Sequence, residues 1–136
     1  MTEQNHNTAA KPEAEEIVSE TLMQASEAWN GTPYTAYPGG KPQLTVMKMH
    51  IPAHASLPWH SHSMPNIAYI LSGSLTIEDR ESGETHQVKA GEALNEAVGD
   101  IHRGYTTDEP AELVIVYAGA EGLPLSVSLP GEPEEF

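Results

Sequence analysis

The sequence predicts an all-β domain, either an antiparallel sandwich or a barrel. The prediction rests on short runs in which apolar and β-branched residues alternate, and on the closely spaced turns between those runs. Turns such as Ser72-Gly73 and Gly99-Asp100 follow one another too closely for βαβ units. The predicted strands cover residues 44–51, 66–71, 74–78, 85–89, 93–98 and 112–117, with a further strand expected at 125–129.

Residues 15–29 precede these strands and have the spacing of a short helix. Their apolar side chains recur at intervals of 4, 3 and 4 residues, at Val18, Leu22, Ala25 and Trp29. The Asn30-Gly31 pair would end such a helix. Alternatively, the IVSET stretch within this segment forms an edge strand. In either form, we expect the segment to pack against the exterior of the barrel.

The chain of 136 residues is long enough for one domain of ordinary size. We divide it into a disordered acidic lead-in at 1–16, an N-terminal extension at 17–42, a barrel at 43–129 and an acidic tail at 130–136. The middle part is dense in Val, Ile, Leu and Tyr, which is enough for one core. We interpret the acidic ends as solvated tails.

The formal charge is −14, from 20 acidic and 6 basic residues. Nucleic acids and anionic membranes repel such a chain, so neither is expected as a partner. There is no cysteine, so a metal site would need histidine, carboxylate or amide ligands. The N-terminus lacks the basic and apolar regions of a signal peptide, and no apolar run reaches membrane-spanning length. We therefore expect a cytoplasmic location.

The main chemical signal among the seven histidines is the close pair His60 and His62. Alternate side chains of a strand point to the same face, with Cα atoms about 6 to 7 Å apart. Two imidazoles on one face can converge on a metal ion at about 2.0 to 2.2 Å from each ring. Alone, the pair is a weak signal and favours two surface histidines that bind nothing.

A longer pattern begins at this pair. The chain reads His60-Ser-His62-Ser-Met-Pro-Asn66, and Gly73 follows after six more residues. This arrangement resembles the first motif of the cupin superfamily, with Asn66 in the position of a glutamate.

A later stretch resembles the second cupin motif. Gly91, Gly99 and His102 match it, whereas Ala97 stands where proline is usual and Thr106 where asparagine is. The two motifs together extend over about residues 43–118. The resemblance implies a double-stranded β-helix, the cupin jelly-roll barrel, with ligands on its inner face and His102 opposite the first histidine pair.

The resemblance also implies that His60, His62 and His102 bind one divalent metal ion. Histidine ligands are compatible with iron, zinc, nickel and manganese alike. Asn66 in place of a glutamate removes a negative charge and a hard ligand from this site. Asn66 either binds the metal through its carbonyl oxygen or hydrogen-bonds a metal-bound water.

Glu96 is a second candidate for the site. In the predicted strand ALNEAV, Leu94 and Glu96 share one face, and the cupin pattern places apolar, barrel-facing residues at these positions. An inward carboxylate is costly unless it is paired or binds metal. We therefore interpret Glu96 as a fourth ligand or as a catalytic general acid/base with a raised pKa. A strand register shifted by one residue would place it in solvent instead.

The remaining candidates are weaker. His50, His54 and His86 are expected on the surface or at strand edges. Tyr105, next to the second motif, is the one aromatic residue that we consider for a pocket.

Two functions fit this sequence. The first is a metal-dependent enzyme of oxygenase, lyase or isomerase type that acts on a small molecule. The second is a non-catalytic module that binds or senses a small molecule or a metal. A homodimer is also expected, formed when the C-terminal strand pairs with the sheet edge of a neighbouring copy.

Overall fold

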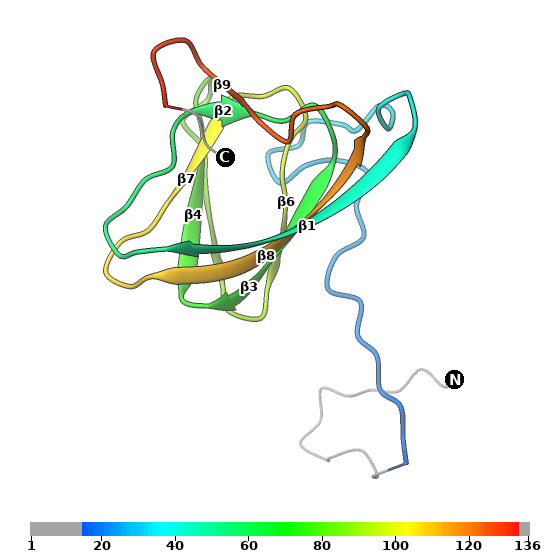
Figure 1. The fold of residues 1–136 in the computed structure, drawn as a ribbon. Coiled ribbons are helices and arrows are strands. Elements are labelled where there is room, and N and C mark those ends of the chain that lie inside the picture. The colour runs from blue at the N-terminus through cyan, green and yellow to red at the C-terminus, as the bar shows by residue number, and fades with distance from the viewer. Residues whose placement is uncertain (1–14, 134–136) are drawn as a thin grey trace.

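The computed structural model describes residues 15–133, which contain nine strands and no helix (Figure 1). The all-β prediction is confirmed. The strands are β1 (Pro42–Ile51), β2 (His60–Ser61), β3 (Asn66–Ser72), β4 (Ser74–Asp79), β5 (Thr85–Lys89), β6 (Ala93–Asn95), β7 (His102–Tyr105), β8 (Ala111–Ala120) and β9 (Val127–Ser128). Among these residues there is likewise no helix that is long and apolar enough to cross a membrane.

The strands form two antiparallel sheets. One has the order β1-β8-β3-β6, and the other has the order β5-β4-β7-β2-β9. Successive strands therefore often lie in different sheets, as in a jelly roll. The sheets face each other around one core, into which β3 directs Ala68 and Ile70, β4 directs Ile77 and β6 directs Leu94.

The turn between β3 and β4 requires glycine. Gly73 has a φ of 76°, a conformation that other residues rarely adopt. A Cβ atom at this position would lie 1.9 Å from the carbonyl oxygen of Pro110. The glycine of the first motif is therefore needed for a close backbone contact with the residue that precedes β8, not for chemistry.

The predicted helix at residues 15–29 is wrong. Residues 16–25 have no regular secondary structure, no strand forms at IVSET, and Val18 and Leu22 are exposed. The reason is that the end of this segment bonds to β6 and to residues 32–34 instead of forming the hydrogen bonds of a helix. The backbone N–H of Trp29 donates to the carbonyl of Asn95, and the Asn95 amide donates to the carbonyl of Glu27. At this end Ala28 is buried.

Other differences concern strand ends. The strand predicted at 93–98 ends at Asn95, and β7 lies where no strand was predicted. The C-terminal strand is present as β9, but it pairs with β2 of the same chain. Positions 1–14 of the predicted lead-in and 134–136 of the tail lie outside the described residues.

Candidate metal centre

Three histidines meet at one end of the space between the sheets. His60 begins β2, His62 follows it, and His102 begins β7, where it is directly opposite His60 in the strand register. The ring centroids are 4.9 Å apart for His60 and His62, 4.6 Å for His60 and His102, and 5.0 Å for His62 and His102. All three side chains are buried. The structure thus brings together the three histidines selected from the sequence.

Each of the three rings is held through its Nδ1 atom by a backbone carbonyl. The acceptors are Pro58 at 2.7 Å from His60, Leu125 at 2.8 Å from His62 and Asp100 at 3.0 Å from His102. A carbonyl only accepts, so each Nδ1 carries a hydrogen, and Nε2 is the ring atom of each residue that can bind a metal ion. The ligand atoms of the three residues lie within 4.8 Å of one another. This arrangement could hold a divalent transition metal.

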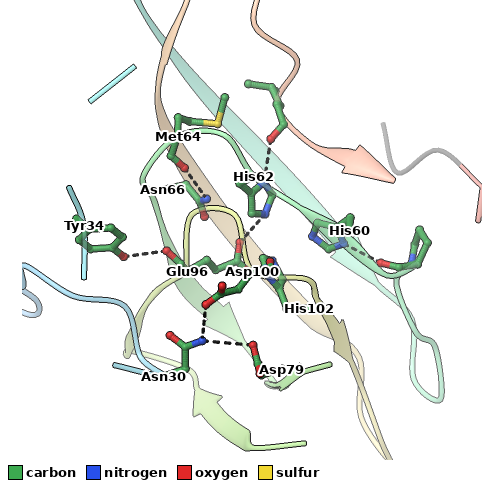
Figure 2. A network of polar contacts seen from close by, with 12 residues as sticks. Asn30, Tyr34, His60, His62, Met64, Asn66, Asp79, Glu96, Asp100 and His102 are labelled. Carbon is green, nitrogen blue, oxygen red and sulfur yellow. Dashed lines mark hydrogen bonds and ion pairs between the residues drawn. The ribbon is translucent and has the colours of Figure 1, made fainter. Parts of the chain in front are cut away.

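Glu96 points into this cluster from the residue after β6 (Figure 2). Its Oε1 atom lies 2.8 Å from Nε2 of His62, and its Oε2 atom lies 3.7 Å from Nε2 of His102. The side chain is only 13% exposed. The inward orientation predicted from the Leu94 and Glu96 alternation is confirmed, and the shifted register is wrong.

The pKa of Glu96 moves in the direction opposite to the prediction. Burial raises the pKa of this carboxyl, but the charges of His102 and His62 and hydrogen bonds from both rings outweigh burial and hold it well below its usual value. The pKa of His60 falls to about 4, because burial and repulsion from His102 disfavour its charged form. At neutral pH the site therefore contains an ionised Glu96 and a neutral His60, and both forms suit metal ligation.

Asn66 begins β3 beside the histidines and is 2% exposed. Its amide nitrogen donates to the carbonyl of Met64 at 3.4 Å, while its buried Oδ1 atom has no hydrogen-bond partner among residues 15–133. Leaving such an acceptor unsatisfied costs about 1 to 3 kcal/mol. A metal ion or a water bound to it would satisfy this oxygen, which is consistent with either role considered for Asn66.

A second group of polar residues, which sequence reasoning missed, supports the centre from the N-terminal side. Asn30 and Thr32 both donate to the side chain of Asp100, whose carbonyl holds His102. The Tyr34 hydroxyl donates to the carbonyl of Glu96 at 2.8 Å (Figure 2). In the sequence these residues are ordinary polar residues of a Gly- and Pro-rich loop, and no motif marks them.

The C-terminal segment closes the same end of the barrel. It provides the Leu125 carbonyl to His62, and Leu123 and Leu125 pack against the core. An enclosed cavity of about 20 Å³ between the two sheets is lined by the first histidine pair, Glu96, Tyr117 and apolar side chains. A cavity of this size holds about one water molecule.

The weaker candidates lie elsewhere. His50 and His86 are exposed, and His54 lines an open groove on the outside of the five-stranded sheet. Tyr105 lines that same groove with Arg103 and points away from the histidine cluster. The structure therefore does not bring Tyr105 to the centre.

Known structures share this architecture. The DMSP lyase DddQ from Ruegeria pomeroyi DSS-3 superimposes with a TM-score of 0.58 at 22% identity, over 76% of this chain and 49% of that protein. The polyketide cyclase RemF from Streptomyces resistomycificus gives 0.56 at 22% identity, over 67% and 63% of the two chains. A cupin-like protein from Thermotoga maritima gives 0.55 at 17% identity, over 63% and 64%. The present chain thus spans about half of the lyase and less than two thirds of the other two proteins.

No curated protein matches the sequence significantly. The family described as "Cupin domain" matches residues 47–117, which is more than half of the 136 residues. The matched range contains all three clustered histidines, Asn66 and Glu96. The chain therefore belongs to the cupin family.

Proposed function

We propose that this cupin binds a divalent transition metal through His60, His62 and His102 and catalyses a proton-transfer reaction, of lyase or isomerase type, on a small molecule. The observation that carries the proposal is the set of three buried rings whose Nδ1 atoms are all held by carbonyls. Three preoriented Nε2 atoms leave further coordination positions for a substrate. Iron, zinc, nickel and manganese are the candidate ions.

Glu96 is the proposed general base. A bound divalent ion would polarise a carbonyl or carboxylate oxygen of the substrate and acidify the neighbouring C–H bond. The ionised Glu96 carboxylate can then accept this proton. The electron pair of the C–H bond either forms a C=C bond as a leaving group departs, in a lyase, or accepts a proton at another carbon, in an isomerase. A glutamate carboxylate is ionised throughout the neutral range, so the base is present in its reactive form.

The structural neighbours are consistent with this reaction class, since one is a lyase and another is a polyketide cyclase. Their identity to this chain is at most 22%, so their substrates are not transferred.

A second candidate function is a module that binds the metal, alone or with a very small ligand on it, without turnover. The enclosed cavity of about 20 Å³ favours it, because a substrate larger than water enters only if the closing segments move. Turnover distinguishes the two functions, since both require the metal.

The first test is elemental analysis of the purified protein. We expect stoichiometric metal in the wild type and its loss in a His60→Ala, His62→Ala double variant. A His50→Ala, His86→Ala double variant is the matched control, because both residues are exposed and lie away from the centre. If the wild type stays without metal after reconstitution, both candidate functions are wrong.

The second test examines Glu96. The metal-loaded protein is incubated in D2O with small carboxylic acids and carbonyl compounds, and loss of C–H signals or appearance of alkenes is followed by NMR. Glu96→Gln should retain metal and lose exchange or turnover, whereas Glu92→Gln, at an exposed carboxylate, should behave as wild type. If Glu96→Gln instead weakens metal binding by about 10- to 100-fold, Glu96 is a ligand or supports one. If no compound reacts, the binding module is favoured.

A further inference from the structure

The polar residues that line the enclosed cavity all gather around His62. Glu96 lies 2.8 Å from Nε2 of His62, and the ring centroids of His60 and Tyr117 lie 4.9 and 5.9 Å from that of His62. The rest of the lining is aliphatic or methionine and comes from both sheets. Any part of a ligand that extends beyond the histidine centre would therefore contact hydrocarbon.

No cation among residues 15–133 lines this cavity. Lys41, Lys48, Lys89 and Arg80 are exposed. Arg103 lies in the open groove on the outside of the five-stranded sheet, where its Nε atom bonds to Glu78 at 3.0 Å. A negatively charged group in the apolar part of the cavity would consequently find no counterion.

The charge of the centre admits one anionic group. Each histidine keeps a hydrogen on Nδ1, so the three rings are neutral when their Nε2 atoms bind a metal. A divalent ion together with the Glu96 carboxylate then carries a net charge of about +1. One carboxylate on a ligand neutralises this charge. A second one would add a buried and unpaired charge, which is costly.

Leu57 lies between this cavity and the surface. Among the apolar residues that line the cavity in the described part of the chain, it is the one that is not fully buried. It precedes β2 in an irregular segment, and its side chain lies over Gly104 of β7. A Cβ atom added at Gly104 would lie 3.6 Å from the Cδ1 atom of Leu57. Because the cavity holds about one water molecule, a ligand has to displace a side chain, and Leu57 is the one nearest to solvent.

We propose that the site takes a small ligand with one metal-binding carboxylate or carbonyl group and a short, uncharged, apolar remainder, and that Leu57 limits the length of this remainder. The inference rests on the proposed metal binding by His60, His62 and His102. Each methylene of the remainder that becomes buried should strengthen binding about fourfold. Dicarboxylic, phosphorylated and polyhydroxylated compounds are excluded, because their additional polar groups would lose water without gaining a partner.

Visible absorption of the cobalt-loaded protein tests the ligand class. A site of histidine ligands accepts cobalt, and its absorption bands change when a ligand replaces water on the ion. Butyrate and succinate are matched probes, since both have four carbons and succinate carries the second carboxylate. We expect succinate to bind at least about 10-fold more weakly than butyrate to the wild type at neutral pH.

The role of Leu57 is tested with acetate and hexanoate as probes. Leu57→Ala should strengthen hexanoate binding relative to acetate binding by about 10-fold and leave the cobalt content unchanged. Leu44→Ala is the matched control, because Leu44 is 74% exposed and does not line the cavity. Circular dichroism verifies folding, and Leu57→Val is the milder variant if Leu57→Ala unfolds.

The outcomes separate this inference from the proposed function. Succinate that binds as tightly as butyrate would overturn the ligand class, and so would a cobalt-loaded protein whose bands change with neither acid. A folded Leu57→Ala protein with the wild-type ratio of hexanoate to acetate binding would overturn the role of Leu57. In all these cases metal binding stands. A protein that takes up no cobalt would instead overturn the proposed function, and this inference with it.

Discussion

The N-terminal and C-terminal segments both reach the histidine centre, but they support it in different ways. The N-terminal segment bonds through its backbone to Asn95, but it reaches the loop that carries Glu96 and Asp100 with the side chains of Asn30, Thr32 and Tyr34. The C-terminal segment uses mainly its backbone, through the Leu125 carbonyl and the pairing of β9 with β2, with one side-chain contact from Glu132 to the N–H of Trp59.

This difference indicates how each support can be removed. Single substitutions can break the N-terminal contacts one at a time. The C-terminal contacts survive most substitutions and require loss of the segment itself. The predictions below test this contrast, from the largest expected effect to the smallest.

Deletion of residues 122–136 should have the largest effect. It removes β9 and the acceptor for His62, and it exposes core surface that Leu123 and Leu125 cover. We expect the free energy of unfolding to fall by about 3 kcal/mol or more in urea titrations. Leu125→Ala keeps the carbonyl and should cost less, about 1 to 3 kcal/mol. Equal unfolding midpoints for the deletion and the wild type would show that this segment is not a structural support.

Asn30→Ala should have the next largest effect. The Asn30 amide donates to Asp100 at 3.0 Å and to Asp79 at 3.3 Å, and so it bridges two carboxylates (Figure 2). Its loss should cost about 2 kcal/mol of unfolding free energy, because hydrogen bonds to charged groups are the stronger ones. Asn30→Asp should cost more, since a third carboxylate replaces the donor. Gln87→Ala, at an exposed position, is the control and should unfold like the wild type.

Asp79→Asn tests the anchor of the N-terminal segment through its pH dependence. Burial raises the pKa of Asp79, but hydrogen bonds from Ser82 and Asn30 outweigh it, so the pKa lies below its usual value. Such a carboxylate stabilises the fold above its unfolded pKa of about 3.9, and this contribution is lost as pH falls through the folded value. Asp79→Asn should therefore be less stable than the wild type at neutral pH, by about 1 to 2 kcal/mol.

The difference between the Asp79→Asn and wild-type proteins should shrink in denaturant titrations below about pH 4. A difference that stays constant from neutral to acidic pH would mean that the charge of Asp79 does not contribute.

Tyr34→Phe should have the smallest effect. Phenylalanine differs from tyrosine only by the hydroxyl group, which here donates to the Glu96 carbonyl. We therefore expect the free energy of unfolding to fall by about 1 kcal/mol. Tyr37→Phe is the control at an exposed tyrosine. An unchanged midpoint for Tyr34→Phe would mean that this contact does not hold the Glu96 loop.

Much of the barrel could be predicted because apolar and polar residues alternate along its strands. The same alternation at Leu94 and Glu96 correctly predicted that the Glu96 carboxylate points inward. The direction of the Glu96 pKa could not be predicted. It depends on His62 and His102, which reach Glu96 only when the sheets close around them.

The N-terminal segment was predicted wrongly for a similar reason. Its apolar spacing fits a helix, but the hydrogen bonds available at Asn95 favour an extended chain, and no local pattern records them. The supports from Asn30 and Tyr34 also span more than sixty positions of sequence, to Asp100 and Glu96.

The three carbonyls that fix the histidine rings have a consequence for divergence. Every residue type has a backbone carbonyl, so the side chains at Pro58, Asp100 and Leu125 can change over evolutionary time while the tautomer of each ring stays fixed. The hydrogen bonds that orient the three imidazoles therefore depend on the path of the main chain and not on the side chains at these positions. We therefore expect distant relatives to keep the three histidines while the residue types at the positions of Pro58, Asp100 and Leu125 vary. The hydrogen bonds to the histidine rings would stay the same.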